Sequence, residues 1–94
     1  MNTLDILEGT QRTADGHLIG VLAAQAGDGG SGRARIGVRC GESSEVERFT
    51  VQEHASVVLA DGWTLRVVHV RHSPSASRPI VTIVLHGGDE VSPE

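Results

Sequence analysis

The chain has 94 residues and a net charge of −4, with eight arginines, no lysine and only two aromatic residues, Phe49 and Trp63. A chain of this length forms one domain with a small core, and its acidic balance argues against a nucleic-acid-binding protein, which normally presents a basic field. No apolar stretch reaches the ~20 residues that cross a membrane and the N-terminus lacks the pattern of a signal peptide, so we expect a cytoplasmic protein without a membrane partner.

Glycines and turn residues divide the chain into short β-rich runs, and no window shows an apolar stripe of helical period. The predicted strands, in chain order, are Leu4–Gly9, His17–Ala24, Arg33–Cys40, Val46–Val51, Ser56–Leu59, Trp63–His72 and Ile80–His86. The polar tail, residues 88–94, is expected to fray. This spacing predicts one all-β domain over residues 1–94, a small β-sandwich or flattened barrel of about seven antiparallel strands.

Alternation along the strands predicts which side chains face the core. In the third strand Ala34, Ile36, Val38 and Cys40 alternate with Arg33, Arg35, Gly37 and Arg39, which indicates a half-buried strand. The run from Trp63 to His72 changes parity, which favours a β-bulge near Val67–His69. The almost wholly apolar run Ile80–Leu85 predicts a central strand covered on both faces.

Residues 6–41 and 51–87 read as two versions of one unit, each a hairpin plus a returning strand. Sliding the sequence by 46 residues lays Ala14-Asp15-Gly16 on Ala60-Asp61-Gly62, Val21 on Val67, Val38 on Val84 and Gly41 on Gly87, with seven identities in 34 aligned positions. An internal duplication explains the match, and so do two unrelated hairpins with Asp-Gly turns. Either origin predicts two similar sheet units packed on each other.

Five histidines are the first candidates for chemistry, because imidazole is the usual general base near neutral pH. His69 and His86 are the candidate catalytic residues, since they lie on neighbouring predicted strands; structural histidines, or a metal-binding pair or triad of histidines, are the alternatives. The spacing matches no zinc signature, with no HExxH, no CxxC and a single cysteine, so we expect no metal and no cofactor. Cys40 is expected to be a buried, inert thiol, and Asp61 a turn residue.

Arg33, Arg35 and Arg39 form a stripe on one strand face and are the candidate binding residues. Guanidinium groups in a row can bind carboxylate or phosphate, or they can simply form a solvated face that blocks pairing with other molecules. Trp63 follows the second Asp-Gly turn, where it either packs on one end of the core or lines the mouth of a ligand site.

The phrases "RTADGHLIGVL" and "VVLADGWTLRVVHV…PIVTIVL" resemble an uncharacterised family of small domains from Streptomyces and other actinobacteria. The resemblance spans most of the chain and implies a small all-β fold and an actinobacterial source; it transfers no catalytic residue. The segment "VQEHAS" departs from the family pattern, because it lacks the glycine expected before its strand pair.

Two functions are compatible with these features. The first is a binding or accessory protein that engages a protein or peptide partner through a sheet face or edge. The alternative is a small β-barrel enzyme or cyclase of secondary metabolism in which His69 or His86 shuttles a proton. A filled sandwich favours the binding protein and a closed barrel with a large apolar cavity favours the enzyme. The scarcity of aromatic residues also predicts a homodimer that buries additional apolar area.

Overall fold

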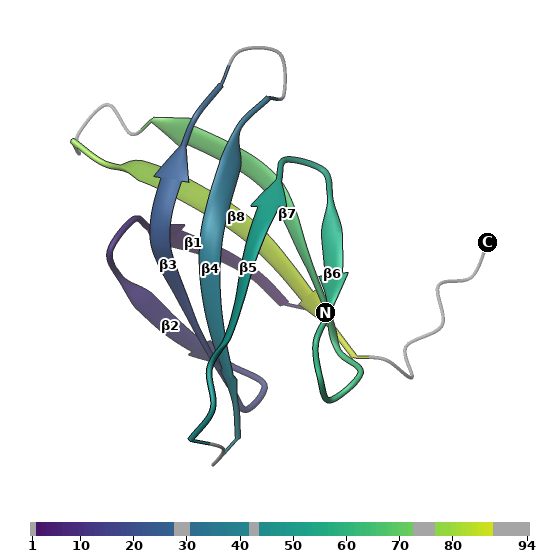
Figure 1. Ribbon diagram of the computed structural model, residues 1–94. Helices are drawn as coiled ribbons and strands as arrows, with labels where there is room; N and C mark the ends of the chain where they lie inside the picture. The colour runs from purple at the N-terminus through teal and green to yellow at the C-terminus, as the bar shows by residue number, and fades with distance from the viewer. Residues whose placement is uncertain (1, 28–30, 42–43, 73–76, 88–94) are drawn as a thin grey trace.

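The computed structural model describes residues 2–27, 31–41, 44–72 and 77–87, which form two antiparallel four-stranded sheets packed as a β-sandwich (Figure 1). The strands are β1 (Asn2–Leu7), β2 (Gln11–Ala14), β3 (His17–Gln25), β4 (Arg33–Cys40), β5 (Glu47–Gln52), β6 (Ser56–Val58), β7 (Thr64–His72) and β8 (Pro79–His86). None of the described residues forms a helix that could cross a membrane. The predicted tail, residues 88–94, lies outside the described residues.

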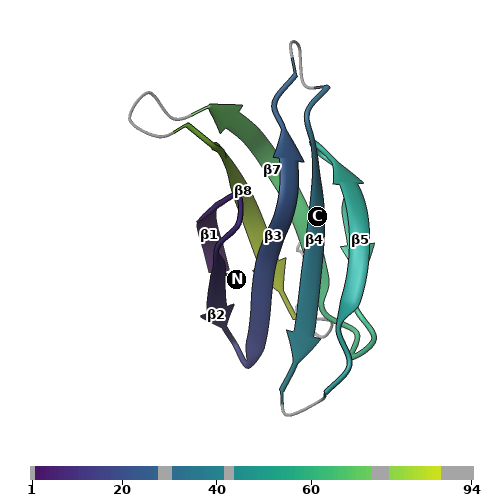
Figure 2. The ribbon, with the colours of Figure 1, turned by 60° about the vertical axis from the view of Figure 1, so that its left-hand side comes forward.

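Each sheet combines three consecutive strands of one half of the chain with the first strand of the other half. One sheet has the order β2-β3-β4-β5 and the other β1-β8-β7-β6, so β5 completes the first half's sheet and β1 completes the second half's (Figures 1 and 2). Every pairing is antiparallel. The strand order of one sheet therefore becomes that of the other when each strand is replaced by the strand four places away in the chain, so that β1 takes the place of β5 and β6 that of β2.

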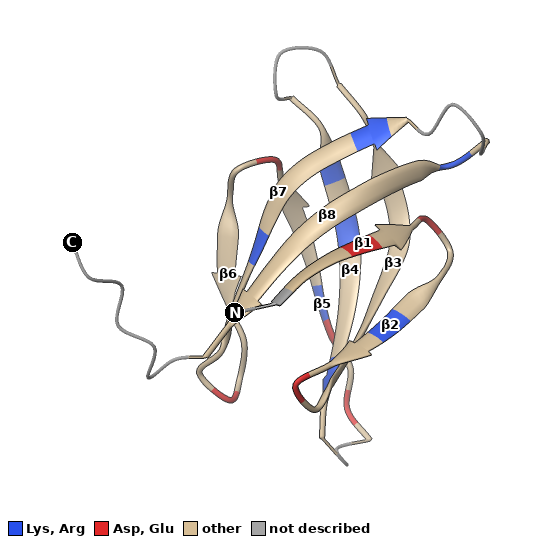
Figure 3. Ribbon diagram, turned by 180° about the vertical axis from the view of Figure 1, so that it is seen from behind, with Lys and Arg blue, Asp and Glu red and all other residues tan. Residues whose placement is uncertain are grey.

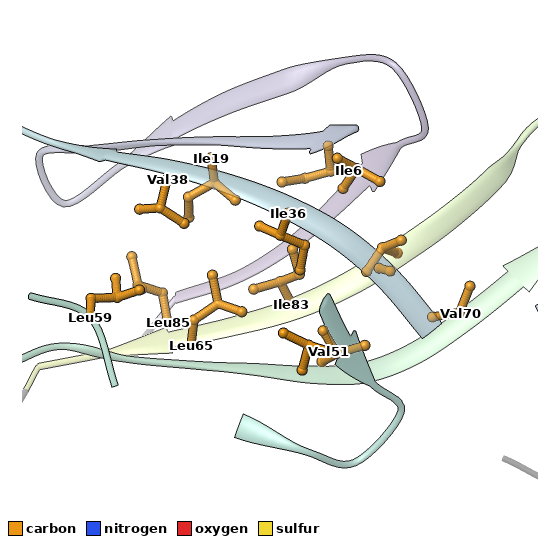
Figure 4. Packing of buried hydrophobic residues seen from close by; sticks show 14 residues of the cluster. Ile6, Ile19, Ile36, Val38, Val51, Leu59, Leu65, Val70, Ile83 and Leu85 are labelled. Carbon is orange, nitrogen blue, oxygen red and sulfur yellow. The ribbon is translucent and has the colours of Figure 1, made fainter. Parts of the chain in front are cut away.

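The core lies between the sheets and consists of aliphatic side chains (Figure 4). Among the described residues fourteen hydrophobic ones are buried, and none of these is aromatic. Ile6, Ile19, Ile36, Ile83 and Leu85 are fully buried, and each contributes about 1.5–3 kcal/mol to the free energy of unfolding. The described interior is thus filled by side chains, as in a sandwich.

The ladders show how far the two halves correspond. The β3–β4 pairing shifts between Val21 and Ala23, and the β7–β8 pairing shifts between Val67 and His69, 46 residues later in both cases. The predicted bulge in β7 is confirmed, whereas the one in β3 was not predicted. In the returning strands β4 and β8, equivalent residues are 47 positions apart in the sequence rather than 46. Ile19 pairs with Val38, while its counterpart Leu65 pairs with Leu85.

This single-residue difference decides which sequence matches are structural. Val38 is buried, but Val84, aligned with it in the sequence, points to the outer side of β8 and is half-buried. A shift of one residue turns a strand side chain to the opposite face. The identities of Val38 with Val84 and of Gly41 with Gly87 therefore do not reflect equivalent positions.

The connections β1–β2 and β5–β6 repeat one hydrogen-bonded corner. In the first, Gly9 N donates to Val21 O and Val21 N to Thr10 O; in the second, His54 N donates to Val67 O and Val67 N to Ala55 O. Both corners need a left-handed residue, with φ of 85° at Gly9 and 71° at His54. His54 thus has a left-handed backbone conformation that favours glycine, although it carries a side chain.

A glutamate precedes each of these residues and binds the bulged strand. Glu8 accepts a hydrogen bond from Ala24 N at 2.8 Å, and Glu53 accepts one from Val70 N. Glu53 also accepts from Gly32 N at 2.9 Å. By the ladder register the counterpart of Gly32 is Pro79, which has no N–H to donate. The second corner therefore holds its glutamate more tightly than the first.

The prediction of about seven strands missed β2, a short edge strand. Its sequence, QRTA, has no apolar alternation, and its residues are exposed except for the half-buried Ala14. The strand Arg33–Cys40 was predicted with its observed bounds, and its alternation is confirmed. β8 is central, as predicted, but only its inward residues are buried; the outward Ile80, Thr82, Val84 and His86 are half-buried. The expectation that both of its faces are covered was wrong.

Candidate functional site

The outer side of sheet β2–β5 carries an exposed group of arginines. Arg33, Arg35 and Arg39 project from β4, as predicted, and Arg48 projects beside them from β5, where it pairs with Gly37. We call these four residues the cationic face (β4 and β5 in Figure 3). None of the described residues on the outward side of β3, β4 and β5 is acidic.

A shallow groove of about 480 Å³ lies on this face, and Arg39 and Arg48 are among its lining residues. Gly20 and Gly37 form a pair at its floor, where neither strand contributes a side chain. Leu22 and Val46 flank Gly37 and expose 52% and 43% of their surface. Exposed apolar side chains around a hollow are typical of binding surfaces.

A second concavity, of about 380 Å³, lies on the same sheet side toward the β3–β4 hairpin. Arg33 and Arg35 line it together with Ala23 and Thr50. The cationic face therefore offers two hollows, each bordered by a pair of guanidinium groups. Such pairs can grip successive carboxylates in bidentate geometry.

A different set of polar side chains converges at the end of the sandwich where β3 begins and β4 ends (lower end of Figure 2). His17 and Cys40 are cross-strand neighbours, and Asp61 reaches them from the β6–β7 turn. One potential ligand atom from each of these residues lies within 4.8 Å of the other two. We call His17, Cys40 and Asp61 the end cluster.

Hydrogen bonds fix the end cluster. His17 Nε2 lies 2.7 Å from Asp61 Oδ2, and Trp63 N donates to Asp61 Oδ1 at 3.1 Å. Cys40 Sγ donates to Glu47 Oε2 at 3.9 Å. His17 is only 3% exposed, and its Nδ1 has no hydrogen-bond partner among the described residues. The cluster is open to solvent on the side of Asp61, whose side chain is 35% exposed.

The surroundings shift the pKa of two of these groups. Burial raises the pKa of the Cys40 thiol, and the negative charges of Asp61 and Glu47 raise it further. Burial alone would also raise the pKa of Asp61, but hydrogen bonds from Trp63 N and His17 outweigh it and lower that pKa. The thiol is therefore protonated beside an ionised carboxylate, which makes Cys40 a poor nucleophile by itself.

Trp63 packs beside the end cluster. Its ring lies 5.0 Å from the ring of His17, centroid to centroid, at an angle of 56°. The side chain is half-buried against the core. Of the two expected roles, core packing describes this position, and Trp63 lines neither hollow of the cationic face.

The two candidate catalytic histidines are not brought together. His69 pairs with Thr82 of β8 and His86 lies four residues further along that strand, a separation of roughly 13 Å at the usual rise per residue. His69 is 55% exposed, and its Nδ1 lies 2.9 Å from Glu53 Oε2. His86 is half-buried at the end of β8.

Sequence reasoning missed His17 and Arg48 as site residues and treated Cys40 and Asp61 as structural. Counting back from the β3–β4 hairpin loop would have placed His17 opposite Gly41, because the unpredicted bulge between Val21 and Ala23 shifts the register by one residue and so pairs His17 with Cys40. The approach of Asp61 had no comparable signal, since it depends on how the two sheets pack.

Comparisons with known proteins found no matching family model, no similar curated protein and no similar solved structure.

Proposed function

We propose that this protein is a binding module that holds an acidic segment of a partner protein on the cationic face. The observation that carries the proposal is the gathering of Arg33, Arg35, Arg39 and Arg48 around two hollows on one sheet side, where the described outward residues of β3, β4 and β5 include no acidic one. Carboxylates spaced along an extended peptide would meet the guanidinium groups, and an apolar side chain would cover Leu22 and Val46.

The charge of the whole chain favours a short acidic segment over a long polyanion. Twelve acidic residues outnumber the four arginines outside the cationic face. A nucleic acid or an anionic membrane extends beyond the face and would be repelled by this field, whereas a peptide meets only the arginines. Partner identity as a protein or peptide, and a cytoplasmic location, remain parts of this proposal.

The homodimer expected from the sequence stays a prediction, but we do not assign it to this face. A two-fold contact here would set the arginines of two copies against each other, which costs free energy. The enzyme alternative gains little support, because the described interior is filled by aliphatic side chains and neither hollow of the cationic face is lined by a histidine.

We expect weak affinity, between millimolar and tens of micromolar, and strong dependence on salt. Each exposed arginine–carboxylate pair contributes about 0.2–1 kcal/mol, and the contact of one apolar side chain with the groove adds about 1–2 kcal/mol. Screening by 0.5 M salt should weaken the charged contribution. Tight, salt-insensitive binding is therefore not expected.

The test is fluorescence anisotropy with labelled peptides in which Glu or Asp alternates with Leu, compared with peptides carrying Gln and Asn instead. The acidic peptides should bind, and the double variant Arg39→Glu/Arg48→Glu should weaken binding at least tenfold. Arg66→Glu is the matched control, because Arg66 is exposed on β7 of the other sheet. Equal binding of neutral peptides, equal losses in both variants, or a preference for heparin or anionic vesicles would contradict the proposal.

A further inference from the structure

We propose that the end cluster of His17, Cys40 and Asp61 is a binding site for a zinc-type transition-metal ion, with the carboxylate of Glu47 next to its sulfur ligand. The proposal does not depend on the cationic face, which lies on the outer side of the sheet. It rests on the geometry of the cluster, the chemistry of its donor atoms and its charge.

The geometry needs only small adjustments to hold an ion. Ligand atoms around tetrahedral zinc lie about 3.3–3.8 Å apart, because the metal–ligand distances are about 2.0–2.3 Å. The three ligand atoms of the cluster are already within 4.8 Å of one another, and Nε2 of His17 lies 2.7 Å from Asp61 Oδ2. A metal ion would replace the proton between these two atoms. Glu47 Oε2 is 3.9 Å from Cys40 Sγ, which makes this carboxylate a neighbour of the sulfur ligand.

The scaffold around the donors is rigid where a ligand must be held. His17 is the first residue of β3 and Cys40 the last residue of β4, and the two pair directly in the ladder. His17 is buried and packed against the ring of Trp63. Asp61 is held by the hydrogen bond from Trp63 N. The cluster is open to solvent at Asp61, which leaves a path for the ion.

The donor set selects the kind of metal. A thiolate and an imidazole bind zinc and related transition metals well, whereas calcium and magnesium require oxygen ligands. One sulfur, one nitrogen and one or two carboxylate oxygens form a set that Zn²⁺ accepts in tetrahedral geometry.

The charge of the cluster also favours a cation. Two carboxylates, those of Asp61 and Glu47, face the Cys40 sulfur, and among the described residues only His17 can place a positive charge beside them. A divalent ion would displace the thiol proton to solvent and form the metal–sulfur bond, so that the cluster is close to neutral when loaded. The same carboxylates disfavour a catalytic thiolate, for which cationic neighbours are required.

A bound ion would join the two sheets at this end of the sandwich. His17, Cys40 and Glu47 belong to sheet β2–β5, while Asp61 lies in the turn between two strands of the other sheet. Binding to the folded state alone should raise the melting temperature by about 10–20 °C when free zinc is 100-fold above the dissociation constant.

The experiment is titration of the chelator-treated full chain with Zn²⁺ and with Co²⁺, followed by a competing dye, by absorption and by thermal unfolding. We expect one ion per chain, tetrahedral cobalt bands, and a thiolate-to-cobalt charge-transfer band. Cys40→Ser should abolish that band and weaken zinc binding at least about 100-fold, and Asp61→Asn should weaken it at least about tenfold. Asp15→Asn, in the corresponding turn of the first half, should change neither the charge-transfer band nor the affinity for zinc.

The variants also test whether the other histidines bind the zinc. His54, His69, His72 and His86 are unchanged in all variants, so zinc held by them would still bind after Cys40 or Asp61 is replaced. Melting of Cys40→Ser and Asp61→Asn in chelator, compared with the parent chain, shows whether each variant folds. The proposal is overturned if the chain binds no zinc at stoichiometric levels, or if both folded variants bind zinc as tightly as the parent. Octahedral cobalt spectra without a thiolate band would overturn it as well.

Discussion

Replacing Glu53 by glutamine should destabilise the fold by about 3 kcal/mol. The side chain is 2% exposed, and its oxygens receive hydrogen bonds from Gly32 N, Val70 N and His69. A hydrogen bond to a charged group contributes about 1.5–3 kcal/mol. Glutamine keeps one acceptor oxygen but turns an NH₂ group toward a donor, so about two of these contacts are weakened or lost.

This loss is large against a total stability of about 5–15 kcal/mol for a domain of this kind. Urea unfolding followed by the fluorescence of Trp63, the only tryptophan, measures it directly. The matched control is Glu8→Gln in the equivalent corner. Glu8 is half-buried and accepts the hydrogen bond from Ala24 N, while Pro79 replaces the second backbone donor, so we expect a loss of about 1 kcal/mol or less. Equal losses in the two variants would refute the reasoning.

The same carboxylate predicts how stability depends on pH. Burial by itself would raise the pKa of Glu53, but the hydrogen bonds from Val70 N, Gly32 N and His69 outweigh it and hold the pKa below its usual value of 4.5. A pKa that is lower in the folded state means that the unfolded chain binds more protons as the pH falls. The stabilisation is therefore complete above about pH 4.5 and is lost as the pH drops through the folded pKa. Glu53→Gln should show a flatter decline in this acidic window than the parent chain.

Three further predictions concern other parts of the fold. His54→Gly should raise stability by up to about 1 kcal/mol, because it removes a side chain from a left-handed residue, and Gly9→Ala should lower it; thermal melts of the two variants test both signs. Ile83→Ala should cost about 2–5 kcal/mol, since the side chain is fully buried; a loss below 1 kcal/mol in urea unfolding would show that the core is loosely packed there. In chelator at pH 7, Cys40 should alkylate more slowly than a free thiol, and Asp61→Asn should speed the reaction by removing a negative neighbour; a rate unchanged by Asp61→Asn would count against this electrostatic cause.

The fold could be predicted from the sequence because its strands carry local signals. Alternation in Arg33–Cys40 identified both the strand and its exposed arginines, and the parity change identified the bulge at Val67–His69. β2 carried no such signal, since an exposed edge strand needs no apolar residues. The number of strands was therefore one too low, although the fold class was predicted correctly.

The candidate sites were predictable only where one strand determines them. The arginine stripe lies on β4 alone, and alternation revealed it. Arg48 joins it through the β4–β5 register, and Asp61 joins His17 through the packing of one sheet on the other. Such contacts depend on pairing and on layer packing, which a sequence pattern does not specify.

The two related halves provide an internal comparison for the end cluster. By the ladder registers His17 corresponds to Trp63, Cys40 to Gly87 and Asp61 to Asp15. The equivalent positions of the second half thus hold a glycine and an indole ring, and the indole ring packs against His17 at the same end of the sandwich. The polar set in the first half leaves a buried nitrogen without a described partner and sets a thiol against carboxylates. Because these features cost folding free energy, a ligand that they bind gives a physical reason for their presence.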